Sequence, residues 1–112
     1  MARPVLPPDV ELSLARFRAA LAERFGARLA AVLLFGSRAR GEARPDSDVD
    51  VLVLVEGLTR AERHEVIDVA ADLDYEHFVG LAPLVMSTAD FERLRAREAG
   101  LALDIDREGV SL

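Results

Sequence analysis

The sequence GSRARGEARPDSDVD, residues 36–50, decides the fold because it separates two apolar runs that have the length of strands. The run before it is LAAVLLF, residues 29–35, and the run after it is VDVLVLV, residues 49–55. Continuous apolar runs of this kind are typical of strands that are buried on both faces. Residues 36–50 contain two glycines, three arginines and four acidic residues. So much polarity between two buried strands is unfavourable unless the loop has a role, and we interpret residues 36–50 as a ligand-binding loop.

Two carboxylates lie at the start of the second strand. Because side chains alternate between the faces of a strand, Asp48 and Asp50 are expected to project to the same side, about 7 Å apart along the backbone. They repel each other unless a cation lies between them. Mg²⁺ suits such a pair, since it takes one or two carboxylates and completes its coordination with water and substrate phosphates. The pair predicts a metal site; the alternative is a pair of solvated turn acids paired with nearby arginines.

The other half of the predicted site follows the first strand. Gly36 lets the backbone approach a ligand closely, and the backbone amides at the start of a short helix after it can face a phosphate. The Ser37 hydroxyl adds one donor, and Arg38 and Arg40 can reach phosphate oxygens, although a solvated loop arginine is equally compatible with the sequence. If the two strands are antiparallel neighbours, this turn and the carboxylate pair meet at one edge of the sheet.

Helical periodicity and capping residues predict the remaining elements. Pro83 predicts that the third strand either lies at an edge of the sheet or has an irregular entry, because proline cannot donate a hydrogen bond to a neighbouring strand. The predicted elements are an irregular lead-in at 1–8, a helix at 10–25 capped by Asp9 and ended by Gly26, a helix from the Thr59–Glu62 capping box to about Leu73, a strand at 81–87, a helix from Ser87 or Thr88 to about Glu98, a helical stretch at 101–107 and a short strand at 110–112.

The composition restricts the class of protein. The 112 residues are about half apolar, which is enough for one domain, 1–112, with its own core. Absence of cysteine excludes a disulfide framework and a thiolate metal site. A net charge of −6 disfavours direct binding to nucleic acid. The sequence has neither a signal-peptide core nor a membrane-spanning run, which predicts a cytoplasmic protein without membrane association.

The pattern Gly36-Ser37, ten residues, then Asp48-Val49-Asp50 resembles the minimal nucleotidyltransferase family of the polymerase-β-like nucleotidyltransferase superfamily. The resemblance implies an α/β fold with a mixed sheet flanked by helices, and Mg²⁺-dependent transfer of AMP from ATP. It implies that Gly36 and Ser37 hold the β- and γ-phosphates and that Asp48 and Asp50 bind the metal. Many members are encoded beside a HEPN-domain ribonuclease and act as its antitoxin by transferring AMP to a tyrosine. A HEPN-domain partner is therefore expected, and homo-oligomers are possible.

One feature departs from the family pattern. Active members have a third carboxylate on the strand after the second long helix, and here that strand, LAPLVMS at 81–87, contains no acid. The nearest acids are Asp74 and Glu76, just before it. Three hypotheses follow: an adenylyl-transferring antitoxin, a degenerate domain that binds nucleotide or a partner and inhibits by occlusion, and a small-molecule nucleotidylating enzyme. The third is disfavoured because the chain leaves little room for an acceptor domain.

Overall fold

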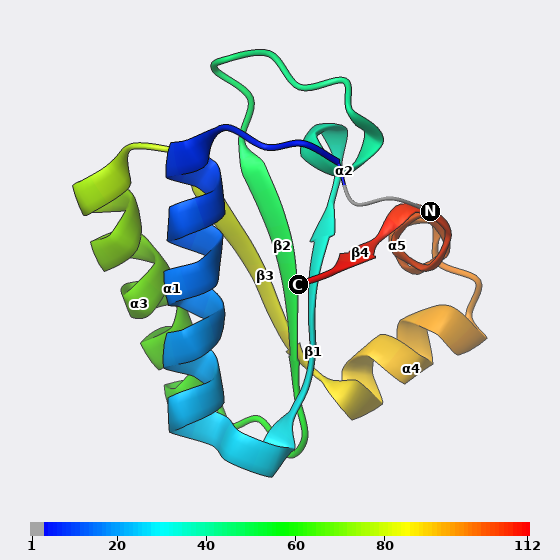
Figure 1. Ribbon diagram of the computed structural model, residues 1–112. Coiled ribbons are helices and arrows are strands. Elements are labelled where there is room, and N and C mark those ends of the chain that lie inside the picture. The colour runs from blue at the N-terminus through cyan, green and yellow to red at the C-terminus, as the bar shows by residue number, and fades with distance from the viewer. Residues whose placement is uncertain (1–3) are drawn as a thin grey trace.

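Four strands form one mixed sheet in the computed structural model, which describes residues 4–112 (Figure 1). The two apolar runs become the central strands β1 (Leu29–Phe35) and β2 (Val49–Val55), which pair antiparallel and so meet the condition on which the predicted site depended. Strand β3 (Leu81–Ser87) pairs parallel with β2, and β4 (Val110–Ser111) pairs antiparallel with β1. The order β3-β2-β1-β4 places β3 at an edge, which agrees with one of the two interpretations of Pro83.

Helices cover both faces of this sheet (Figure 1). The long helices α1 and α3 pack on one face, and α4 and α5 lie on the other. The predicted α/β class, a mixed sheet flanked by helices, is confirmed. The helices are α1 (Pro8–Phe25), followed by a 3₁₀ turn at Gly26–Arg28, α2 (Ser37–Arg40), α3 (Arg60–His77), α4 (Thr88–Ala96) and α5 (Gly100–Glu108).

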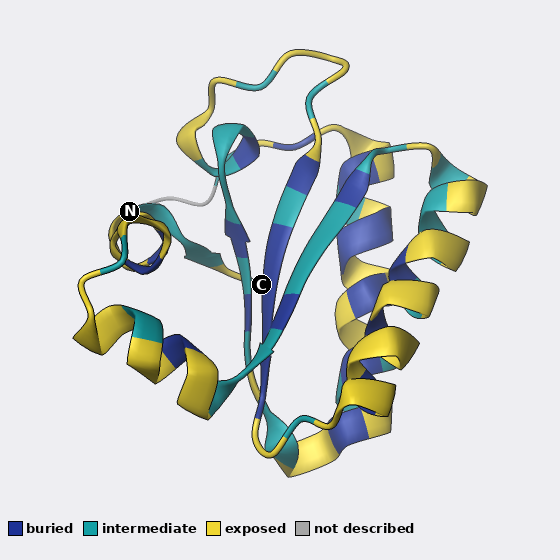
Figure 2. Cartoon of the chain, turned by 180° about the vertical axis from the view of Figure 1, so that it is seen from behind, coloured by how far each residue is buried: buried dark blue, intermediate teal, exposed yellow. Residues whose placement is uncertain are grey.

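The side chains of β2 divide between two apolar clusters. Val51, Val53 and Val55 are buried in the larger cluster with α1 and α3, whereas Leu52 and Leu54 are buried in the smaller cluster with α4 and α5. Figure 2 shows β2 as the most completely buried strand, while the outer surfaces of the helices are exposed. Because faces alternate along a strand, Asp50 belongs to the α4 and α5 side of the sheet.

The structure corrects the predicted start of the first helix and describes only part of the predicted lead-in. Helix α1 begins at Pro8 with Pro7 at its N-cap, so Asp9 lies in the first turn and does not cap the helix. Proline is favoured at the first helical position, here Pro8, because its fixed φ fits the first helical turn. Of the predicted irregular lead-in, residues 4–7 have no regular structure and residues 1–3 lie outside the described residues. Gly26 ends α1 with a φ of 55°, as expected.

Helix α3 continues four residues beyond Leu73, where its apolar periodicity stops. Its end is determined by Asp74, whose carboxylate accepts hydrogen bonds from the backbone amides of Val79, Gly80 and Leu81 at 3.1, 2.8 and 3.0 Å. Phe78 follows in a left-handed conformation with a φ of 53°. These hydrogen bonds of Asp74 leave no periodic pattern of apolar residues in the sequence. The helix predicted from that periodicity therefore ended too early.

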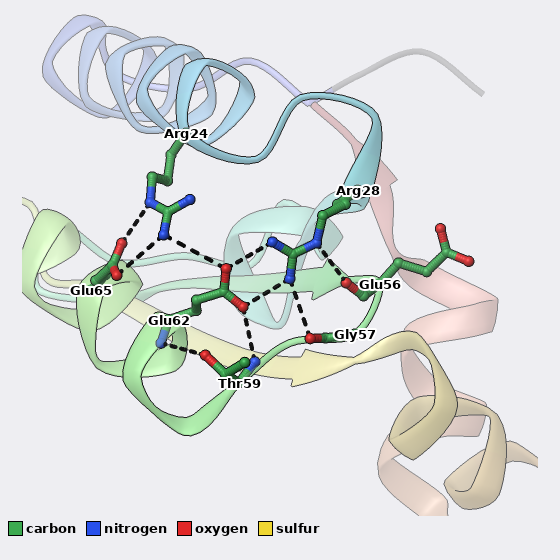
Figure 3. A network of polar contacts seen from close by, with 7 residues as sticks. All are labelled: Arg24, Arg28, Glu56, Gly57, Thr59, Glu62 and Glu65. Carbon is green, nitrogen blue, oxygen red and sulfur yellow. Dashed lines mark hydrogen bonds and ion pairs between the residues drawn. The ribbon is translucent and has the colours of Figure 1, made fainter.

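Glu62 connects the start of α3 to the turn between α1 and β1 (Figure 3). It forms the predicted capping box with Thr59, and its two carboxylate oxygens accept hydrogen bonds from Arg28 at 2.7 and 2.8 Å. Arg28 also donates to the carbonyls of Glu56 and Gly57 at 3.0 and 3.2 Å. The network closes the end of the sheet that is remote from the loop at 36–50.

We expect Glu62→Gln to lower the melting temperature by several degrees at neutral pH. The Arg28 hydrogen bonds, and then the backbone of Thr59, lower the pKa of Glu62 from 4.5 to about 2. A carboxylate with a depressed pKa stabilises the fold above its unfolded pKa and loses that contribution as the pH falls towards its folded pKa. Thermal melts between pH 6 and pH 2 should therefore show the two proteins converging on acidification. Glu65→Gln, which removes an exposed partner of Arg24, is the control; a difference that does not change with pH would contradict this assignment.

Candidate active site

The end of β1 and the start of β2 form one rim of the sheet, at the top of Figure 1. Phe35 lies opposite Asp50 in the antiparallel register, so Gly36, the next residue, follows β1 directly beside the carboxylate pair. The expected short helix, α2, begins at Ser37. The predicted phosphate-binding turn and the two acids therefore share one edge, as expected if the two strands are antiparallel neighbours.

Asp50 packs against the backbone of Gly36. The φ of Gly36 is 76°, and a Cβ atom built there would overlap Oδ2 of Asp50 and lie 3.2 Å from its Cγ. Only glycine combines this conformation with the space that the carboxylate needs. The group that approaches Gly36 closely within the protein is therefore Asp50, one of the two predicted metal ligands.

Asp48 has a similar relation to Gly80, which precedes β3. The amide of Val49 donates to the Gly80 carbonyl at 2.8 Å, and a Cβ atom at Gly80 would lie 3.0 Å from Oδ1 of Asp48. The φ of Gly80 is 73°. Sequence reasoning missed Gly80; its signal was a glycine immediately before an apolar run, the counterpart of Gly36 immediately after one.

The electrostatics of the rim favour a bound cation. Burial of the Asp50 carboxyl, and then the neighbouring charge of Asp48, raise the pKa of Asp50 above its usual value of 3.8, while Arg40 opposes the shift. An acid with a raised pKa is poorly compensated by its protein surroundings. A divalent cation between the two carboxylates would remove this penalty, so the donor set fits a hard, oxygen-preferring metal.

The backbone of the turn at α2 is hydrogen-bonded to Gly36. The amides of Ala39 and Arg40 both donate to the Gly36 carbonyl at 3.1 Å. The first amides of a helix have no partner within it, so those of Ser37 and Arg38 remain at its open end. Ser37 is half-buried as the first residue of α2. Its phosphate contact stays a prediction.

The two arginines that were predicted to reach phosphate are engaged within the protein. Arg38 is buried, and one terminal nitrogen of its guanidinium donates to the Ser47 carbonyl at 3.2 Å, immediately before Asp48. Arg40 pairs with Glu42 at 3.0 Å and with Glu108 of α5 at 3.1 Å. In this arrangement both side chains support the loop that carries the acids, and their contact with phosphate stays a prediction.

The place beside Asp50 on β3 is filled by Ala82. The two residues are partners in the parallel register, so their side chains share one face. Neither candidate for a third acid reaches this place: Asp74 binds three backbone amides, and Glu76 lies 3.4 Å from Arg16. Among residues 4–112 no three acidic or histidine side chains converge as possible metal ligands.

Comparisons with known proteins identify the family and the fold. Residues 14–99 match the family model described as a nucleotidyltransferase domain. A Methanocaldococcus jannaschii protein provisionally named protein adenylyltransferase MJ1305 is 37% identical over 71 residues, which cover 61% of this chain and 48% of that protein. Protein adenylyltransferase MntA of Thermococcus cleftensis is 51% identical over 45 residues, which cover 40% of this chain and 43% of that protein. The chain thus spans about half the length of these curated relatives.

Solved structures give the same fold. One described provisionally as a minimal nucleotidyltransferase has a TM-score of 0.60 and 33% identity, with 93% of this chain and 96% of that chain covered. Another, described as a toxin-antitoxin with AMP-PNP, has a TM-score of 0.57 and 22% identity, with 86% of this chain and 69% of that chain covered, and shows the fold alone. The family model covers most of the chain, including residues 36–50, which carry the motif. The chain belongs to the nucleotidyltransferase domain family.

Proposed function

We propose that this protein transfers AMP from ATP to a hydroxyl group of another protein, with Mg²⁺ held by Asp48 and Asp50. One observation carries the proposal: two carboxylates lie at the same rim of the sheet as the Gly36-Ser37 turn, and one of them touches Gly36. Two relatives named protein adenylyltransferases support the choice of a protein as acceptor. Because ATP is the donor, the reaction belongs to the cytoplasm.

The proposed chemistry assigns a role to each part of the rim. Mg²⁺, when bound, neutralises charge on the phosphates of ATP and needs phosphate oxygens to complete its coordination, since the protein supplies only two carboxylates. The turn at Gly36 and Ser37 holds the β- and γ-phosphates with backbone amides and one hydroxyl. The acceptor oxygen bonds to the α-phosphorus, and the bond from that phosphorus to the departing pyrophosphate breaks. Positioning and charge neutralisation account for most of such catalysis.

The absence of an acid on β3 affects the fate of the acceptor proton. With Ala82 beside Asp50, no third carboxylate of residues 4–112 joins the pair to accept it. The proton must then pass to solvent or to a group of the acceptor itself. We therefore expect transfer to be slow at neutral pH and to accelerate as the pH rises towards the pKa of the acceptor hydroxyl.

The proposed acceptor is a HEPN-domain toxin, which makes the protein an antitoxin. The motif resemblance supports this choice, and a structure of the same fold is described as part of a toxin-antitoxin. The test is incubation of the two purified proteins with ATP labelled on the α-phosphate. Label is expected on the HEPN-domain protein, while ATP labelled on the γ-phosphate should transfer none. Absence of label with the wild-type pair would contradict the proposal.

A second candidate function is favoured by the same Ala82. A protein with only two carboxylates can bind nucleotide or a partner without transferring AMP, and it would then inhibit a toxin by covering it. The two functions differ in a toxicity assay with Asp48→Asn. Protection that survives the substitution supports occlusion, and protection that is lost supports transfer.

Ala82→Asp tests how far the missing carboxylate limits the site. Its carboxylate would lie beside Asp50 on the same face, so we expect a lower melting temperature without metal, because like charges repel, and metal affinity higher by about tenfold. Titration calorimetry with Mg²⁺ and with Mn²⁺ measures the gain. Ala82→Asn has the same shape without the charge and should leave the affinity unchanged. An equal effect of both variants would contradict the register argument.

A further inference from the structure

The outer edge of β3 borders a cavity at the end of the sheet opposite the candidate active site. The cavity has a volume of about 660 Å³, and its lining includes the consecutive strand residues Leu84 to Ser87. The active-site rim adjoins the start of β3, because Leu81 is the register partner of Val49, whereas Leu84 to Ser87 lie beside Leu52 to Val55. The two places are therefore separate.

Four arginines line this cavity. Arg60 and Arg63 come from the start of α3, Arg93 comes from α4, and Arg97 directly follows the last residue of α4 as its C-cap. Asp90 is the single acid among the lining residues, and it pairs with Arg93. Within the described part of the chain no hydrogen bond or ion pair engages the other three guanidinium groups. A chain with a net charge of −6 thus concentrates unneutralised positive charge at one cavity.

The strand edge itself is available for hydrogen bonding. Strand β3 is the last in the sheet order, so alternate backbone groups on its outer side have no partner strand. Pro83 has no amide hydrogen, which confines any added strand to Leu84 and the residues after it. An extended peptide that adds to such an edge gains backbone hydrogen bonds, and flanking side chains provide its specificity.

We propose that the edge of β3 and the four arginines form a docking groove for an extended, carboxylate-rich segment of a partner protein. The open backbone groups select an extended polypeptide, and the arginines select acidic side chains through charge-assisted hydrogen bonds. Nucleic acid fits less well because it lacks the repeating amide and carbonyl pattern of a strand. A second copy fits less well because pairing of two β3 edges would bring two sets of arginines together. The proposal does not depend on nucleotidyl transfer.

A defined peptide tests the groove on the full chain. The probe is a fluorescein-labelled ten-residue peptide that alternates glutamate and valine, and the comparison peptide has lysine in place of glutamate. We expect the glutamate peptide to bind, with amide resonances of Leu84 to Ser87 shifting in ¹⁵N-resolved spectra, and the lysine peptide not to bind. Arg60→Gln combined with Arg97→Gln should raise the dissociation constant of the glutamate peptide by about tenfold at low salt.

Arg18→Gln combined with Arg107→Gln is the matched control, because it removes the same charge from arginines that do not line the cavity. It should leave peptide binding unchanged. Equal losses in both double variants, or resonance shifts away from β3, would overturn the proposal. It would also be overturned if the Arg60 and Arg97 variant bound the peptide normally but self-associated, since the arginines would then serve only to keep the edge unpaired. Tenfold tighter binding of a phosphoserine peptide would reassign the groove to phosphate.

Discussion

Asp50→Asn is expected to abolish nucleotidyl transfer while raising the melting temperature of the metal-free protein. The loss of activity should be roughly a thousandfold or more, because a metal ligand contributes several kcal/mol to stabilising charge in the transition state. The gain in stability has a separate cause. Burial and the neighbouring Asp48 raise the pKa of Asp50, so its ionised form disfavours the folded state. An acid with a raised pKa makes the folded protein more stable as the pH falls through that pKa, and asparagine removes the penalty at every pH.

Thermal melts with and without Mg²⁺-ATP, together with a transfer assay, measure both effects. The wild-type protein should gain stability on adding Mg²⁺-ATP, and Asp50→Asn should gain much less. Asp46→Asn is the control, because it removes an exposed acid from the same loop. If Asp50→Asn retained transfer, or if Asp46→Asn behaved in the same way, the carboxylate pair would not be the centre of the site.

Gly36→Ala is expected to lower both the stability of the fold and the affinity for Mg²⁺-ATP strongly, although it adds only one methyl group. Two costs combine: a φ of 76° is strained for alanine, and the new Cβ would overlap Oδ2 of Asp50. Strain of this kind costs about 1–3 kcal/mol. Relief of the overlap must move either the turn or the carboxylate, so Mg²⁺-ATP affinity should fall by about a hundredfold.

Gly57→Ala separates strain from contact. Gly57 has a φ of 63°, but a Cβ atom there meets no other atom within 4 Å, and it lies in the turn at the remote end of the sheet. We expect it to lower the melting temperature modestly and to leave Mg²⁺-ATP affinity unchanged. Calorimetric unfolding and nucleotide titration of the two variants provide the comparison. Equal nucleotide affinity in both variants would show that the position of Asp50 does not depend on Gly36.

The strands were predictable because their signal is local. Each of the runs 29–35, 49–55 and 81–87 is apolar, is bounded by polar or turn residues, and coincides with an observed strand. The edge position of the third strand agrees with one of the two interpretations of Pro83. The sequence implied that Gly36 meets the carboxylate pair only if the first two strands are antiparallel neighbours, and the structure supplies that pairing.

The features that the sequence did not reveal depend on contacts between strands or on single buried groups. Gly80 approaches Asp48 only because β3 pairs parallel with β2, and the same register places Ala82 beside Asp50. Arg38 reads as a solvated loop residue until its side chain is seen buried against the Ser47 carbonyl. The extra turn of α3 depends on Asp74 and its three amides. Such pairings have no periodicity along the chain.

The most direct test is calorimetric titration of ATP into the protein, with and without Mg²⁺, for the wild type and for Asp48→Asn. The proposed site predicts saturable binding at one site that requires Mg²⁺ and that Asp48→Asn weakens by at least about tenfold, because the metal links the carboxylates to the phosphates. Binding of ATP that is equally tight without metal, or that survives Asp48→Asn unchanged, would contradict a metal-bridged nucleotide at this rim.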